Sequence, residues 1–159
     1  MKQEPIHIRK GEAHDIDALH RLIRELAIYE KAEDKVETTP EIMLQDGFGK
    51  SPLFEFFVAE TEGREIVGIA LFYFGYSTWR GKMMYLDDLV VTSSHRRKGI
   101  GYQLFDALIR YAKANEAKQL RWHVLDWNEP AIAFYEKLEA TLDPEWITCW
   151  LNREQILTY

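Results

Sequence analysis

The chain has 159 residues, 47% of them apolar and 13% aromatic, which is enough for one packed domain but too little for two. Its net charge of −6 argues against a general attraction to nucleic acid and favours cationic partners. The single cysteine, Cys149, excludes an intrachain disulfide, and no apolar run has the length of a signal peptide or a membrane span, so we expect one cytoplasmic domain over residues 1–159 without membrane contact.

The first part of the chain predicts a strand and two helices. Apolar and polar residues alternate over residues 5–11, which is typical of a strand. Apolar residues then recur at helical spacing from Asp15 to about Lys31. Thr39 and Pro40 follow in the order of a helix cap and a first helical residue, so a short second helix is expected there.

The middle of the chain predicts three antiparallel strands, because three segments rich in β-branched and aromatic residues are separated by short turns. These segments are residues 53–61, 64–77 and 81–93. A helix follows, with apolar residues on one face from Ile100 to Ala112.

The last part predicts a strand at residues 118–127, a helix capped by Asn128 and a final strand at residues 145–152, in which Cys149 is expected to be a small buried side chain. The strand before the long helix and the strand after it should be parallel neighbours. The predicted fold is therefore an α/β protein with a mixed, mostly antiparallel central sheet flanked by helices.

A basic, glycine-containing turn opens the long helix, in the segment SSHRRKGIGYQLF. A helix N-terminus presents unpaired N–H groups and the positive end of a dipole, and glycines let a ligand approach the main chain. We therefore predict an anion site at Gly99 and Gly101. The nucleotide motifs do not fit, because no Lys-Ser or Lys-Thr follows the second glycine and position 104 is Leu. From the residues alone, a solvated basic turn and a nucleic-acid patch stay open as alternatives.

Arg96, Gly99 and Gly101 occupy the three fixed positions of the pattern Arg/Gln-x-x-Gly-x-Gly/Ala. The segment resembles the cofactor motif of the GNAT superfamily of acetyl-CoA-dependent N-acyltransferases. The resemblance implies a GNAT-like acyl-CoA N-acyltransferase fold, acetyl-CoA as cofactor and no metal. In that family the turn holds the CoA pyrophosphate and the preceding strand binds the pantetheine arm. The cofactor-binding residues that it implies are Leu89, Val90, Val91, Arg96, Arg97, Lys98, Gly99, Ile100, Gly101, Tyr102, Asn128 and Tyr135.

A narrower resemblance covers residues 22–34, 45–49, 76–91 and 124–140, which are similar to successive segments of the spermidine/spermine acetyltransferases and their thialysine-acetylating relatives. It implies direct acetyl transfer to a primary amine of a small cationic substrate, and a homodimer. At Ser77-Thr78 the polyamine enzymes carry Asp-Pro, whereas the thialysine-type relatives carry Ser-Thr, so a lysine-like amine is favoured. Glu139 is a departure, because relatives have Gly there, which leaves the turn after the last helix open.

Two residues are candidates for the chemistry. Acetyl transfer needs a neutral amine and a proton donor for the departing thiolate, and an alkylammonium with a pKa near 10 is almost fully protonated at neutral pH. Tyr135 matches the family's tyrosine that protonates the CoA sulfur; alone, it would be taken for a core aromatic. Asp87 matches the glutamate thought to act as a base through water, and its shorter side chain makes a water relay more necessary.

The substrate-binding candidates are an acidic and aromatic set. Asp87 and Asp88 lie in an otherwise apolar strand, where acids are either paired or functional. Because successive strand residues face opposite sides, we expect the two to have different roles. The resemblance adds Tyr29, Glu30 and Trp79, with Glu145 as a further acid; a solvated surface position is the alternative for Glu30.

Three hypotheses about function follow. The first is an N-acetyltransferase that acts without a covalent enzyme intermediate, because no Cys/His or Ser/His pair is evident; His123 is expected to pack in a strand. The second is a catalytically silent CoA-binding module of the same fold. The presence of both Tyr135 and Asp87, the two candidates for the chemistry, argues against it. The third is a nucleic-acid binder using Arg96–Lys98, which the net charge contradicts.

Overall fold

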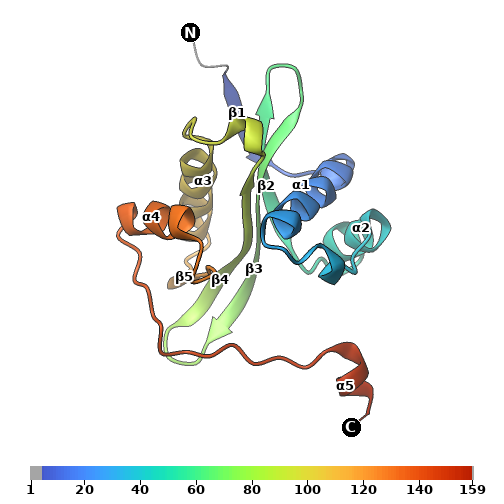
Figure 1. The fold of residues 1–159 in the computed structure, drawn as a ribbon, viewed down its shortest axis with the longest axis vertical. Coiled ribbons are helices and arrows are strands. Elements are labelled where there is room, and N and C mark those ends of the chain that lie inside the picture. Colours follow the sequence, from blue (N-terminus) through green and yellow to red (C-terminus); the bar gives the residue numbers. More distant parts are fainter. Residues whose placement is uncertain (1–4, 159) are drawn as a thin grey trace. The chain divides into compact units, whose positions relative to one another are not determined.

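A five-stranded sheet in the order β1-β2-β3-β4-β5 organises the first part of the chain in the computed structural model (Figure 1). The structure describes residues 5–158, in two units that are taken separately, Met1–His123 and Val124–Tyr159. The strands of the first unit are β1 (Ile6–Lys10), β2 (Glu55–Thr61), β3 (Ile66–Ser77), β4 (Gly81–Val91) and β5 (Gln119–Arg121). Neighbours from β1 to β4 are antiparallel, and β4 and β5 are parallel. The predicted fold class, a mixed and mostly antiparallel sheet with one parallel pair, is confirmed.

Helices cover both faces of this sheet (Figure 1). The helices α1 (Ile16–Tyr29) and α2 (Pro40–Phe48) lie on one face, which we call the α1 face, and α3 (Ile100–Ala114) lies on the other. The core of the α1 face joins apolar side chains of α1 and α2 to alternate residues of the strands, namely Ile16, Leu19, Leu22, Met43, Phe56, Val58, Ile66, Ile69, Leu71 and Val90. The alternate side chains of β2 and β3 point to the other face, where Phe57 and Phe72 contact Tyr111 of α3. The first half of β3 is therefore buried on both sides.

Local signals set the ends of the helices. The Thr39 hydroxyl accepts a hydrogen bond from Ile42 N at 3.3 Å, with Pro40 as the first residue of α2, as predicted. At the start of α1, the Arg9 guanidinium donates two hydrogen bonds to the buried Asp15 carboxylate, at 2.7 and 2.9 Å. Asp15 also accepts from Glu12 N at 2.8 Å. The beginning of α1 is thus fixed to β1.

The second unit contains α4 (Glu129–Lys137) and α5 (Arg153–Leu157). Asn128 Oδ1 accepts a hydrogen bond from Ala131 N at 3.4 Å, which confirms the predicted cap of α4. Glu139 lies in the left-handed region, with φ of 57°. Its N–H and the N–H of Ala140 bond back to Glu136 O and Tyr135 O at 2.9 and 3.1 Å. A helix-ending turn that usually contains Gly therefore forms with Glu in its place.

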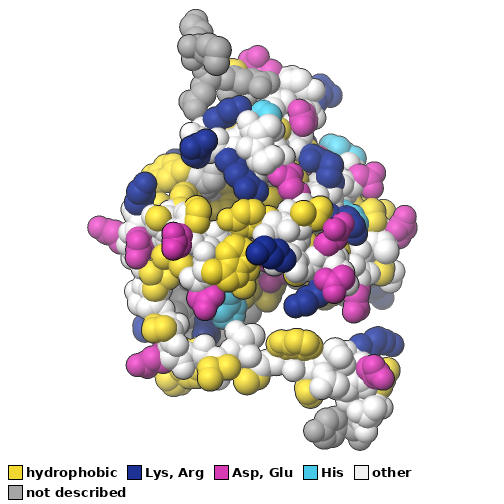
Figure 2. Space-filling model, viewed as in Figure 1, with side chains coloured by type: hydrophobic (Ala, Val, Ile, Leu, Met, Phe, Trp, Pro, Cys, Tyr) yellow, Lys and Arg dark blue, Asp and Glu magenta, His cyan; other side chains and the backbone are white. Residues whose placement is uncertain are grey.

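The predicted final strand at residues 145–152 is wrong. This segment is extended but belongs to no strand, and its apolar side chains are exposed (Figure 2), Ile147 by 87% and Trp150 by 75%. Cys149, expected to be buried, is exposed too. The physical reason is that β-propensity creates a strand only where a partner pairs with its main chain, and the second unit, as far as it is described, contains no strand that could pair with this segment. For the same reason β5 is shorter than the predicted strand at 118–127.

Candidate active site

The turn between β4 and α3 has an open main-chain surface. Gly99 adopts φ of 78°, and a Cβ placed on it would meet no atom within 4 Å. The first intrahelical bond of α3 runs from Gln103 N to Gly99 O at 3.1 Å, so the N–H groups of the residues between them begin the helix without a helical acceptor. These features fit a diphosphate, which needs main-chain donors and close approach.

The three cations before the glycines have different surroundings. Arg96 is held by the protein: its Nε donates to Val91 O at 3.0 Å, and its guanidinium lies 5.0 Å from the centre of the Tyr29 ring. Arg97 and Lys98 are exposed, and Arg97 has φ of 60°. All three cations therefore lie at the surface of the turn, and Arg96 also fixes its shape through Val91 and Tyr29.

The end of β4 that leads into the turn is an open edge. The pairing of β4 with β5 ends at Tyr85 and Arg121. Leu89, Val90 and Val91 follow on β4 with β3 on one side and, within the described residues, no strand on the other. Val90 is buried in the core of the α1 face, while Leu89 and Val91 are half-buried. A ligand arm can pair with this edge as an extra strand would.

A β-bulge interrupts β4 at the predicted acids. Leu86 pairs with Phe72 and Asp88 with Leu71, so Asp87 is left without a partner on β3. Leu71 belongs to the core of the α1 face, so Asp88, opposite to it, lies on that face as well. The charge of Asp87 acts on Tyr73, which lies two residues from Leu71 and so on the same face of β3, and this indicates that Asp87 lies on that face with Asp88. The expectation that they face opposite sides fails here, because the bulge adds one residue to the alternation.

The acids form a cluster with perturbed ionisation. Burial raises the pKa of Asp88 from 3.8 to about 7, with smaller contributions from the charges of Asp87 and Glu30. Burial also raises the pKa of Asp87, against an opposing effect of His123, and raises the pKa of Glu30. Glu30 comes from the end of α1, so two elements supply this acid cluster, which we define as Glu30, Asp87 and Asp88.

Aromatic residues beside the acid cluster were not predicted. Tyr73 and Tyr85 stack with ring centres 5.2 Å apart, and the Tyr85 hydroxyl is hydrogen-bonded to His123 Nδ1. The expectation that His123 packs inside a strand is not met, because β5 ends at Arg121 and the His123 side chain is exposed. The signal that could have found this group is register: if the parallel pairing of Tyr85 with Arg121 continued, His123 would stand opposite Asp87.

The other expected site residues lie apart from this cluster or in the second unit. Trp79 is 86% exposed at the tip of the β3–β4 hairpin. Six residues of strand, roughly 20 Å, separate Gly81 from Asp87, so the first unit does not bring Trp79 to the acids. In the second unit, Tyr135 on α4 is 8% exposed, and burial raises its pKa to about 12. Glu145 is exposed in the extended segment.

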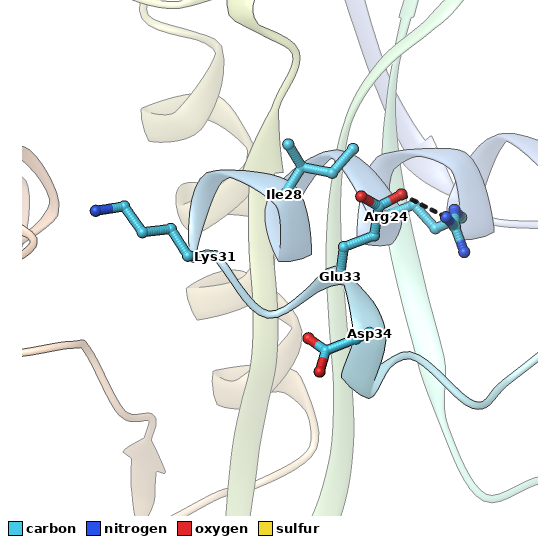
Figure 3. Close-up of a pocket in the computed structure, with 5 residues that line it drawn as sticks. All are labelled: Arg24, Ile28, Lys31, Glu33 and Asp34. Carbon is cyan, nitrogen blue, oxygen red and sulfur yellow. Dashed lines mark hydrogen bonds and ion pairs between the residues drawn. The ribbon is translucent and has the colours of Figure 1, made fainter.

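A shallow pocket of about 530 Å³ lies at the end of α1 and contains none of the expected site residues (Figure 3). An ion pair between Arg24 and Glu33, at 2.6 Å, crosses it, and Ile28, Lys31 and Asp34 complete its lining. It offers a surface charge pair rather than reactive groups, so we place the site at the turn and the acid cluster. No group of three His, Cys, Asp or Glu side chains in residues 5–158 could hold a metal ion, and no helix there is long and apolar enough to span a bilayer.

The fold, with helices on both faces of a mostly antiparallel sheet and a glycine turn between β4 and α3, can now be compared with known proteins. Residues 16–139 match the model of the Acetyltransferase (GNAT) family, and the chain belongs to that family. The resemblance inferred from the sequence, the fold class and the assignment as an N-acetyltransferase are thereby confirmed.

Relatives and solved structures agree with this assignment. The chain is 39% identical over 142 residues to a thialysine N-epsilon-acetyltransferase from Bos taurus, covering 85% of this chain and 84% of the relative. It is 35% identical over 159 residues to spermidine/spermine N(1)-acetyltransferase-like protein 1 from Homo sapiens, covering 94% of this chain and 23% of the relative. The structure of aminoglycoside N-acetyltransferase AAC(6')-Iy in complex with CoA superposes with a TM-score of 0.74 at 16% identity, over 96% of this chain and 97% of that one, which shows the shared fold.

Proposed function

We propose that this protein transfers the acetyl group of acetyl-CoA directly to a primary amine of a small cationic substrate, and that a thialysine or lysine-like amine is preferred to a polyamine. The observation that carries the proposal is the position of the acid cluster of Glu30, Asp87 and Asp88. Two of its members lie near the end of β4, which leads into the turn where we propose that the diphosphate binds. The name of the Bos taurus relative and the Ser77-Thr78 pair support the lysine-like substrate.

The acid cluster suits an ammonium group. Glu30, Asp87 and Asp88 all have raised pKa values, so each is harder to ionise than an ordinary carboxyl group. A cation placed among them would favour their charged forms and would itself be held. Asp87, which is partly desolvated but still open to water and has a raised pKa, is the candidate base that takes the proton of the ammonium group through water.

Acetyl-CoA would supply the activated acetyl group as a thioester. The main chain from Gly99 to Tyr102 would hold its diphosphate, aided by Arg97 and Lys98, and the edge from Leu89 to Val91 would align its arm. Asn128 is a further candidate contact. Tyr135 is the candidate acid for the departing thiolate, since a phenol with a pKa of about 12 keeps its proton at neutral pH.

The proposal includes a single functional domain that acts as a cytoplasmic homodimer. Exposed apolar side chains at the hairpin tip and in the extended C-terminal segment support the dimer, notably Trp79, Trp146, Ile147 and Trp150. Light scattering after size exclusion tests it: a mass of two chains is expected, and a stable monomer at micromolar concentration would contradict it.

Release of free thiol from acetyl-CoA tests the activity, with thialysine, lysine, spermidine, putrescine and aminophosphonates offered side by side. We expect amine-dependent release, fastest with thialysine or lysine. Tight CoA binding without amine-dependent release would favour the silent CoA-binding module instead.

A further inference from the structure

Glu25 connects helix α1 to the cofactor turn, which comprises residues 92–101. Its carboxylate accepts a hydrogen bond from the Thr92 hydroxyl and another from Ser93 N, both at 2.8 Å. Thr92 itself gives no side-chain cap to the short 3-10 helix Ser93–His95. The acid on α1 therefore supplies the acceptor that the start of this helix lacks, and its charge strengthens both bonds.

Arg96 and Tyr29 form a second connection between the same two elements. Arg96 lies 3.9 Å from the Glu25 carboxylate and 5.0 Å from the centre of the Tyr29 ring, while its Nε holds Val91 O. Glu25 and Tyr29 are four residues apart and so share one face of α1. One face of the helix thus fixes both the beginning of the turn and the first residue of the cofactor motif.

The same end of α1 carries the candidate amine-binding residues. Tyr29 is the last residue of α1, and Glu30, which follows it, acts electrostatically on Asp88. The beginning of α1 is held by the ion pair between Asp15 and Arg9. Its last turns are held separately, by the contacts of Glu25 with Thr92 and Arg96 of the cofactor turn. One helix therefore joins the cofactor turn to the acid cluster.

We propose that Glu25 is a positioning residue that couples CoA binding at the turn to amine binding at Tyr29 and Glu30. A diphosphate on the main chain of the turn restricts residues 92–101, and through Glu25 it restricts the end of α1. The first ligand to bind loses conformational entropy by ordering the turn and the end of α1. The second ligand then binds to an element that is already ordered, so each ligand strengthens binding of the other. The proposal rests on the proposed function, since it uses the same two binding sites.

Calorimetry with CoA, which cannot donate an acetyl group, tests the coupling without turnover. The dissociation constant of CoA is measured with and without saturating thialysine in the wild type, Glu25→Gln and Glu33→Gln. We expect thialysine to tighten CoA binding about fivefold in the wild type, and by less than about twofold in Glu25→Gln. Glu33→Gln is the matched control, because it removes the same charge near the same end of α1 but contacts Arg24 rather than the turn.

Affinity for CoA alone does not decide the matter, because removing a negative charge near a diphosphate would itself strengthen binding. Thr92→Val therefore removes one of the two hydrogen bonds to Glu25 without a change of charge, and Thr92→Ser restores the hydroxyl. We expect Thr92→Val to weaken the thialysine effect, since the contacts of Glu25 with Ser93 N and Arg96 remain, and Thr92→Ser to restore it in full. These two variants also decide the question if Glu25→Gln does not fold.

Two results would overturn the coupling: equal CoA affinities with and without thialysine in the wild type, or a full thialysine effect retained in both Glu25→Gln and Thr92→Val. Thiol release by the wild type separates this failure from failure of the proposed function. Turnover without coupling rejects only the role of Glu25, whereas a wild type that binds no CoA removes both proposals.

Discussion

The cofactor turn and the acid cluster meet at the end of β4, yet they are built in different ways. The turn offers main-chain N–H groups, and its side-chain requirement is chiefly glycine where φ is 78°. The acid cluster offers side chains from α1 and β4, brought together by a bulge and by burial. The difference teaches that changes in the turn should affect binding of the cofactor, while changes among the reactive side chains should affect turnover and pH dependence.

The sharpest test of this division is removal of one reactive hydroxyl. Tyr135→Phe should lower kcat by about 100- to 10,000-fold, the usual range for loss of a general acid, while CoA affinity stays within about twofold. Steady-state kinetics and calorimetry measure the two quantities. Tyr76→Phe, which changes a tyrosine that is 74% exposed on β3 and belongs to no proposed site, is the control and should change neither. A parallel loss of kcat and CoA affinity in Tyr135→Phe would mean a packing role.

The turn should give the opposite result. Gly99→Leu places a side chain in the open space above the turn and strains a left-handed residue. The KM for acetyl-CoA should rise about 30-fold, equivalent to about 2 kcal/mol, with kcat within about threefold of wild type. Gly101→Ala is the matched control, because its Cβ would lie 3.9 Å from Val91, an ordinary contact. A Gly99→Leu protein with unchanged KM would remove the diphosphate from this turn.

The acid cluster should give a pH-dependent stability that the turn does not. The folded protein ionises Asp88 only near pH 7, whereas the unfolded chain ionises it near 3.8, so between these values the folded state binds more protons. The free energy of unfolding should therefore fall as pH rises through this window, and the penalty should be complete above pH 7.

Asp88→Asn should consequently stabilise the protein at pH 8 by at least about 1 kcal/mol, the value of a one-unit pKa shift, and have little effect at pH 4. Urea unfolding at the two pH values measures this. Asp106→Asn, which loses only a surface ion pair with Arg110, is the control and should bring no such gain. Equal effects of Asp88→Asn at both pH values would show that Asp88 ionises like an ordinary aspartate.

The smallest effect concerns a second left-handed turn, which has no proposed ligand. Glu139 adopts φ of 57° at the end of α4, where Gly would avoid the clash of a Cβ. Glu139→Gly should stabilise the protein by about 0.5–1 kcal/mol in thermal or urea unfolding, without a change in the KM for acetyl-CoA. Destabilisation would mean that the Glu139 side chain makes contacts that outweigh the strain.

Local signals predicted much of this molecule. The Thr39 and Asn128 caps were identified correctly because a cap is a contact between residues three positions apart. The glycine turn was identified because it depends on φ values that few residues adopt. Features that depend on distant partners were missed: the bulge that brings Asp87 beside Asp88, and Glu25, which the sequence presents as one charged residue on an amphipathic helix.

The sequence by itself determined where α2 and α4 begin, and that a helix N-terminus with glycines follows β4, because these depend on neighbours along the chain. Tertiary structure alone decided the register of β4, which acids share a face, and that Glu25 and Arg96 fix the cofactor turn, because each depends on residues far apart in sequence. It also decided that residues 145–152 form no strand, despite their composition. A strand needs a partner for its main-chain groups, and propensity cannot supply one.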